Sequence, residues 1–216
     1  MAVVAAAGLA GGIAKLSRER VGQEMLKLLA ARQPARAVQT MAQCGVLAHA
    51  LPMARADAPL EALQIVEQRV GASPDPIRRL ALLIWTNSPD ETARSLRLSN
   101  EQFKALKQRR ATDFTLESSA SARRLGYERG ELAGRDVMLL NAAQTTDTID
   151  LKKFRQVTEG ADFELPLTAQ DIMAFGVPAG PAVGKGLSEA EAVWISSDFT
   201  LDKSSLLDHV KARLNG

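Results

Sequence analysis

The apolar positions along the chain recur at the spacing of helices rather than of strands. After Ser17, for example, Met25 and Leu28 lie four and seven positions beyond Val21, which places the three on one face of a helix. No segment alternates strictly between apolar and polar residues for more than a few positions, and no Asn-Gly hairpin signal occurs. The pattern therefore predicts an all-α protein, built as an array of many short helices.

Helix start and stop signals divide the first half of the chain. Ser17 is a predicted N-cap of a helix that reaches about residue 31, and Pro34 opens a second helix that Gly45 ends. A short apolar segment, 46–51, follows, and further helices are predicted after Pro59, Asp75, Ser88 and Ser99. Both Ser88 and Ser99 are followed three residues later by Glu or Gln, as in a capping box. Connections of two to six residues predict that neighbouring helices pack antiparallel or at an angle.

The second half continues in the same way. Helices are predicted over about 117–129, 131–144 and 149–159, followed by a loop at 160–167. Thr168 and Asp171 cap a short helix that ends at Gly176, a further helix begins near Pro181, and a last one covers about 202–214. No internal repeat of fixed period is present.

Composition narrows the class of protein. The 216 residues include one Cys, which excludes an internal disulfide framework, and two Trp, one Tyr and six Phe, which is few for a β-sandwich. The longest uncharged stretch, residues 1–14, is shorter than the roughly 20 residues that a membrane span needs, and no basic segment precedes it. We therefore expect a cytoplasmic protein without membrane contact.

Charge is distributed unevenly over two regions. Residues 1–110 carry 16 Lys and Arg against 9 Asp and Glu, whereas residues 111–216 carry 11 against 16. A positive region attracts phosphates, although the same charges can be scattered over a solvated surface. We take 1–110 and 111–216 as the two predicted domains.

Motifs of catalysis are missing. The chain has no Asp-x-Asp pair for a two-metal phosphoryl-transfer site, no Walker loop, no His-Glu-x-x-His and no Gly-x-Ser-x-Gly. We accordingly predict no catalytic residue and no metal ligand in this chain.

One segment, residues 165–185, has a distinctive pattern. A short capped helix and a glycine turn lead to a second helix that begins at Pro181. The first amides of that helix, with Gly180, Gly184 and Lys185, can form a phosphate site. The alternative is a tight helical hairpin in which the glycines only permit close packing.

Two segments together resemble the class II tRNA nucleotidyltransferases, the bacterial CCA-adding enzymes and their poly(A) polymerase relatives. Residues 16–29, LSRERVGQEMLKLL, are similar to the last head-and-neck motif of that family, and residues 41–52 are similar to its neck. The turn from Gly176 to Lys185, with Glu191, Trp194 and Asp198-Phe199 beyond it, resembles the end of the family's tail. Residues 75–81 and 96–99 also resemble the group, so the resemblance extends over about 8–214.

The resemblance implies a neck, body and tail without the catalytic head. In the family, the head precedes this region and carries the metal-binding Asp-x-Asp; Mg²⁺ and CTP or ATP are expected only there. Glu19, Arg20 and Glu24 would belong to the motif that supports the nucleotide pocket, and without a head we expect them to form interhelical ion pairs. The resemblance does not separate CCA addition from poly(A) addition.

The first hypothesis is therefore binding of tRNA, at its acceptor arm, or of another structured RNA, in tRNA 3′-end processing. The small number of aromatic residues fits recognition of RNA by shape, because proteins that bind single strands rely on aromatic stacking. Candidate phosphate contacts, named from charge clustering and the tail motif, are Arg78, Arg79, Arg109, Arg110, Arg123, Arg124, Lys152, Lys153 and Lys185. The alternatives are a helical protein-interaction or homodimerisation module, in which residues 1–14 dock on a partner such as the head, and a complete enzyme of an unfamiliar kind.

Overall fold

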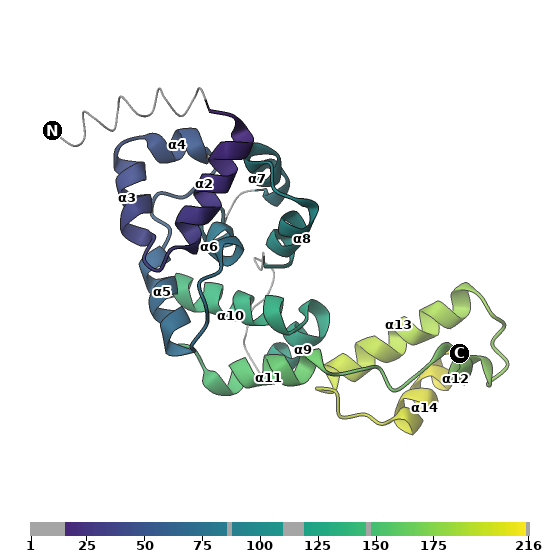
Figure 1. Cartoon of the computed structure of the whole chain (residues 1–216). Helices are drawn as coiled ribbons and strands as arrows, with labels where there is room; N and C mark the ends of the chain where they lie inside the picture. Colours follow the sequence, from purple (N-terminus) through teal and green to yellow (C-terminus); the bar gives the residue numbers. More distant parts are fainter. Residues whose placement is uncertain (1–15, 86–87, 110–118, 146–147, 215–216) are drawn as a thin grey trace. The chain divides into compact units, whose positions relative to one another are not determined.

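The computed structural model describes residues 16–85, 88–109, 119–145 and 148–214, and in these ranges the chain forms helices α2 to α14 (Figure 1). No strand occurs among the described residues, which confirms the predicted all-α class. The predictions for residues 1–14 and for Arg110 lie outside these ranges.

Contacts divide the chain into two compact units, 1–114 with 132–151, and 115–131 with 152–216. The described helices of the first unit are α2 (Arg18–Ala30), α3 (Ala35–Gln43), α4 (Val46–Ala50), α5 (Leu60–Arg69), α6 (Pro76–Leu83), α7 (Pro89–Leu96), α8 (Asn100–Arg109) and, from its second residue, α10 (Glu131–Thr145). Those of the second unit are α9 (Ser119–Arg129), α11 (Leu151–Ala161, from its second residue), α12 (Ala169–Met173), α13 (Pro181–Ser196) and α14 (Lys203–Leu214). A division at residue 110 would assign α10 to the second region, whereas its contacts group it with the first.

Side-chain caps account for several helix starts. Ser17 accepts a hydrogen bond from the Arg20 N–H at 3.3 Å, and Ser99 and Gln102 form a reciprocal capping box at 3.2 and 2.9 Å. Thr168 and Asp171 form the same box at the start of α12. These caps confirm the sequence predictions. Ser88 precedes α7 as predicted, but its side chain makes no capping hydrogen bond.

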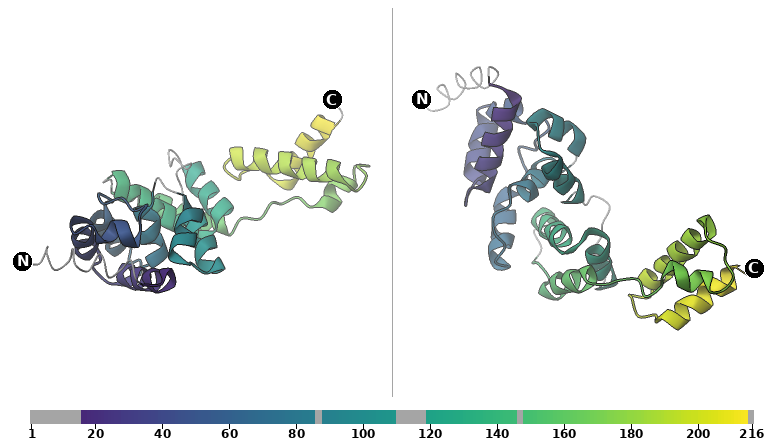
Figure 2. Two further views of the ribbon diagram at one scale, coloured as in Figure 1. Left: turned by 90° about the horizontal axis from the view of Figure 1, so that it is seen from above. Right: turned by 45° about the vertical axis from the view of Figure 1, so that its right-hand side comes forward.

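Helix α6 is the centre of the first unit. It packs against α2, α5 and α8, and every residue from Ile77 to Leu83 is buried (Figures 1 and 2). Asp75 caps its N-terminus by accepting from the Arg78 N–H at 2.8 Å, and Pro76 occupies its first position. A helix buried on all sides forms the core of a helical array.

The second unit combines a glycine contact with an aromatic core. The backbones of α9 and α11 approach so closely that a Cβ at Gly126 would meet the carbonyl of Val157, and one at Gly160 would meet the carbonyl of Arg123. Trp194 of α13 packs edge-on against Tyr127 and Phe199, with ring centroids 5.8 and 4.9 Å apart, and Phe163 joins the cluster. Ala190, Leu206 and Val210 extend this core to α14, beside α13 in Figure 2. Four of the nine aromatic residues of the sequence thus pack together in the core of this unit.

Candidate nucleic-acid interface

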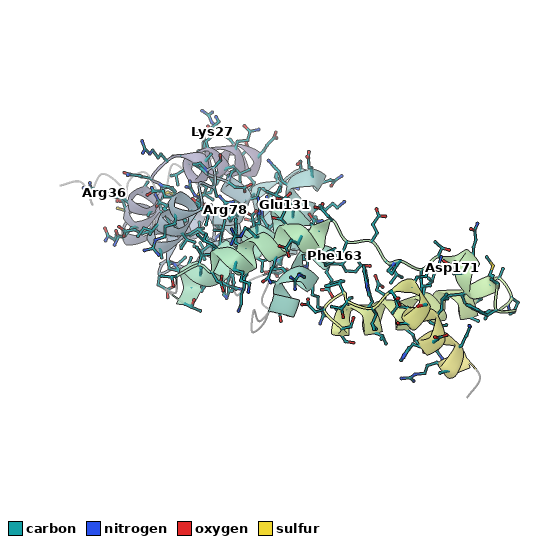
Figure 3. The ribbon with its side chains drawn as sticks, turned by 90° about the horizontal axis from the view of Figure 1, so that it is seen from below. Lys27, Arg36, Arg78, Glu131, Phe163 and Asp171 are labelled. Atoms are coloured by element: carbon teal, nitrogen blue, oxygen red, sulfur yellow. The ribbon has the colours of Figure 1, made fainter. Side chains whose placement is uncertain are left out.

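Three of the predicted phosphate contacts lie in the interior of the first unit. Arg78, Arg79 and Arg109 are exposed by only 3, 1 and 4%. Arg78 donates to Glu67 at 2.8 Å, to Asp136 at 2.6 Å and to the Ser73 carbonyl at 2.6 Å. Figure 3 shows Arg78 among the helices of this unit.

The other two arginines complete the same network. Arg79 donates to the second oxygen of Glu67 at 2.7 Å and to the carbonyls of Leu29 and Ala31 at the end of α2. Arg109 donates to the second oxygen of Asp136 and to Asp75 at 3.0 Å. Three cations and three carboxylates therefore connect α2, α5, α6, α8 and α10.

The buried network corrects the interpretation of these three arginines. Burial lowers the pKa of Arg78, but the attraction of Asp136 and Glu67 outweighs that effect, so the pKa lies above its ordinary value. Each guanidinium is charged, paired and enclosed by protein. Arg78, Arg79 and Arg109 hold helices together in this fold and do not face a phosphate in solution.

Exposed positive charge gathers instead on α2, α3 and the turn between them. Arg20, Arg32 and Arg36 are exposed, and the ion pairs of the described residues involve none of the three. Arg36 is labelled at the outside of the unit in Figure 3, as is Lys27, which pairs with Glu24 at 2.9 Å. Free guanidinium groups on a helical surface can bind phosphate oxygens bidentately. Of these three, only Arg20 was singled out by the sequence motifs.

Glu19, Arg20 and Glu24 lie on the exposed face of α2. The interhelical ion pair expected of Glu24 is wrong, because its partner Lys27 lies three residues further along the same helix. Glu19 accepts from Gln23, also in α2, at 3.5 Å. The side chains of Glu19, Arg20 and Glu24 are therefore accessible to a binding partner.

Arg18, which the sequence analysis did not select, anchors the start of α2. It donates to the carbonyls of His49 and Ala50 at the end of α4, at 3.0 and 2.9 Å, and to the Ser95 carbonyl near the end of α7 at 2.9 Å. Helix C-termini carry partial negative charge and unpaired carbonyls, which a guanidinium satisfies. Arg18 thus positions the helices that carry the exposed arginines.

A groove of about 850 Å³ runs between α3 and α5, next to this basic surface. Arg36 and Gln39 line it from α3, and Glu61, Gln64 and Ile65 line it from α5. Ile65 is 48% exposed, which is unusual for so large an aliphatic side chain. The groove combines amide, charged and apolar groups, as binding sites for organic ligands do.

The glycine-rich turn of the second unit differs from the predicted close-packed hairpin. Gly180 has a φ of +148°, which favours glycine, yet a Cβ at either Gly180 or Gly184 would meet no atom within 4 Å. The close packing lies at Gly186, where a Cβ would contact Ile172 and Val210 at 3.2 and 3.4 Å. Lys185 is exposed, one turn inside α13. Gly180 and Gly184 are therefore exposed, but Pro181 has no amide hydrogen and the Val183 N–H donates to the Gly180 carbonyl at 3.1 Å. The close-packed hairpin was predicted at the wrong glycines.

The remaining candidate cations differ in surroundings. Arg123 is partly buried and pairs with Glu159 at 3.3 Å and with Asp198. Arg124 pairs with Glu128 one turn along α9 at 2.6 Å, so both are held by acidic partners. Lys152 is exposed and Lys153 half-buried, at the start of α11.

Neither a metal-binding cluster nor a membrane-spanning helix occurs in residues 16–85, 88–109, 119–145 and 148–214. No group of three or more His, Cys, Asp and Glu side chains in these ranges is arranged to hold a metal ion. Within the same ranges, no helix has both the length and the apolar character that crossing a membrane requires.

In the first unit, the described helices combine a buried ionic core with a basic face on α2 and α3. Residues 4–57 match a family model described as "Probable RNA and SrmB-binding site of polymerase A". The match covers about a quarter of the chain and includes α2, α3 and α4, so this region is similar to an RNA-binding region of poly(A) polymerase. No curated protein matches the chain.

Proposed function

We propose that the chain binds structured RNA, with the acceptor arm of tRNA as substrate class, as the RNA-binding part of a CCA-adding or poly(A)-adding nucleotidyltransferase. The match of residues 4–57 to an RNA-binding site of polymerase A carries the proposal. In this proposal, the bond-forming residues, the Mg²⁺ and the CTP or ATP belong to a catalytic head outside these 216 residues. Arg20, Arg32 and Arg36 bind phosphates of the RNA, and Glu19 and Glu24 face the head.

Lys185 and the N-terminus of α13 form a second contact to phosphate in this proposal, together with Arg124, Lys152 and Lys153. Helix N-termini favour anions because their first amides have no partner within the helix. Contacts to the backbone of a folded RNA recognise shape more than sequence.

Titration of tRNA at several salt concentrations tests the proposal. The triple substitution Arg20→Gln, Arg32→Gln, Arg36→Gln should weaken binding and reduce the slope of log K against log salt by roughly two to three. The control replaces three exposed cations of the same unit outside the matched segment, Arg69, Arg97 and Lys104, by Gln. Failure of the unaltered chain to bind tRNA at low salt would refute the proposal, and equal effects of the two triple substitutions would refute the assignment to α2 and α3.

Protein docking on the same segment is a second candidate, because the description of the matching family names SrmB beside RNA. Light scattering distinguishes self-association from RNA binding. A dimer that is lost on deletion of residues 1–14, in a chain without RNA affinity, would favour this candidate.

A further inference from the structure

The groove between α3 and α5 is built differently from the basic face beside it. Arg36 is its one lining cation, whereas Glu61 and Asp57 contribute carboxylates, and Asp57 is paired with Arg55 at 3.2 Å. A surface of this charge does not attract a phosphate backbone. It offers instead several hydrogen-bond acceptors around an apolar floor.

The buried Gln64 amide of α5 forms part of the wall of the groove. Gln64 is 7% exposed and lines the groove, and its Nε2 donates to the Arg32 carbonyl at 3.0 Å. Its Oε1 is buried and accepts no hydrogen bond. Because this oxygen has almost no accessible surface, the acceptors that a bound molecule can reach in the groove are those of the exposed Glu61 and Gln68.

Five residues of α5 line the groove: Leu60 at its start, and Glu61, Gln64, Ile65 and Gln68, of which the last three lie three, four and seven positions after Glu61. The exposed Ile65 offers an apolar surface on which a flat ring can lie, and Glu61, Gln64 and Gln68 surround it with oxygen and amide groups. Glutamine recognises adenine by accepting from its exocyclic amino group, and carboxylates accept from that of cytosine.

We propose that this groove holds an unpaired nucleobase of the bound RNA and that it favours bases with an exocyclic amino group over uracil. The proposal rests on the RNA-binding function proposed above. Arg36 lies on both the groove and the basic face, so it can hold the phosphate of the nucleotide whose base enters the groove. Uracil would bring its carbonyl oxygens toward the Glu61 carboxylate, and so it binds less well.

Fluorescence anisotropy with labelled oligoadenylate and oligouridylate of equal length tests the preference. The unaltered chain should bind oligoadenylate at least about fivefold more tightly. The double substitution Glu61→Ala, Gln68→Ala removes two exposed groove residues and should bring the ratio of the two affinities close to one. Because loss of a negative charge strengthens both complexes alike, the ratio reports base recognition rather than charge.

Helix α8 supplies a matched control, since Glu101 and Gln108 are exposed, seven positions apart and outside the groove. The substitution Glu101→Ala, Gln108→Ala should leave the ratio unchanged. The proposal is overturned if the unaltered chain binds both oligonucleotides equally, or if its preference survives Glu61→Ala, Gln68→Ala. RNA binding itself would still stand in either case, and a protein segment would be favoured as the occupant of the groove. Absence of binding to either oligonucleotide and to tRNA overturns the proposed function and this inference together.

Discussion

Arg78 and Asp136 are 58 positions apart in the chain, and their side chains meet at 2.6 Å inside the first unit. Asp136 also accepts from Arg109, so one carboxylate bridges two buried guanidinium groups. Arg78 belongs to α6 and Asp136 to α10. Their pair therefore joins two helices between which the chain passes through a segment of the second unit that includes α9.

Removal of that carboxylate should destabilise the first unit strongly. Asp136→Ala leaves Arg78 and Arg109 buried without one of their partners, and we expect a loss of about 3–5 kcal/mol in the free energy of unfolding. Urea unfolding followed by circular dichroism measures it. Asp90→Ala, which removes an exposed carboxylate 3.6 Å from Lys107, is the control and should cost less than about 1 kcal/mol. Similar losses for both variants would contradict the role of the buried network.

Substitution by alanine should have opposite effects at two glycines, one inside the close contact between α9 and α11 and one outside it. Gly126→Ala drives a Cβ into the Val157 backbone and should cost about 2 kcal/mol or more. Gly184→Ala, in an exposed helical position with open space around it, should stabilise the chain by up to about 1 kcal/mol. Thermal unfolding of the two variants measures both effects. A tolerated Gly126→Ala would show that the two helices are not in contact as described.

Tyr127 is the one tyrosine of the sequence, so its ionisation can be followed by ultraviolet absorbance without interference. Two causes raise the pKa of Tyr127 to about 12: burial, which is the larger, and the hydrogen bond that its hydroxyl donates to Glu191 at 2.6 Å. Glu191→Gln removes the negative charge but not the burial, so the pKa should fall part of the way toward 10.0. The raised pKa stabilises the folded second unit below about pH 10, and this contribution is lost as the pH rises through 12. An unchanged titration in Glu191→Gln would show that the bond does not form.

Asp171 should make the second unit sensitive to acid. Its hydrogen bonds to Lys203 and Thr168 lower its pKa from 3.8 to about 2. Because the folded pKa is depressed, the contribution to stability is complete above about pH 4 and is lost as the pH falls toward 2. The difference in melting temperature between the unaltered chain and Asp171→Asn should therefore be largest near neutral pH and shrink in acid. A difference that does not vary with pH would contradict this.

Local signals in the sequence were enough for most of the fold. Ser17, Ser99 and Thr168 each cap a helix where the pattern predicted it, because a cap involves residues only two or three positions apart. The predicted helix of 131–144 differs from α10 by one residue at its end.

The site was less accessible to sequence reasoning because it depends on distant partners. Arg78 and Arg79 looked like a surface charge cluster, and nothing in their neighbourhood reveals that Glu67 pairs with both of them and Asp136 with Arg78. Likewise, Arg36 and Gln64 come from different helices, and only packing of α3 beside α5 brings them to one groove. The apolar residues around Arg78 and Arg79 in α6 were the one signal that could have indicated their burial.

The contacts of α2 bear on how the molecule can be dissected. Arg79 bonds the last carbonyls of this helix, the Leu96 backbone lies against Gly22, and Arg18 bonds Ser95. All three partners come after residue 57, where the match to the RNA-binding family ends. A peptide trimmed to that match would lack the scaffold that shapes it, so the smallest autonomous fragment worth expressing must include the network around Arg78 as well.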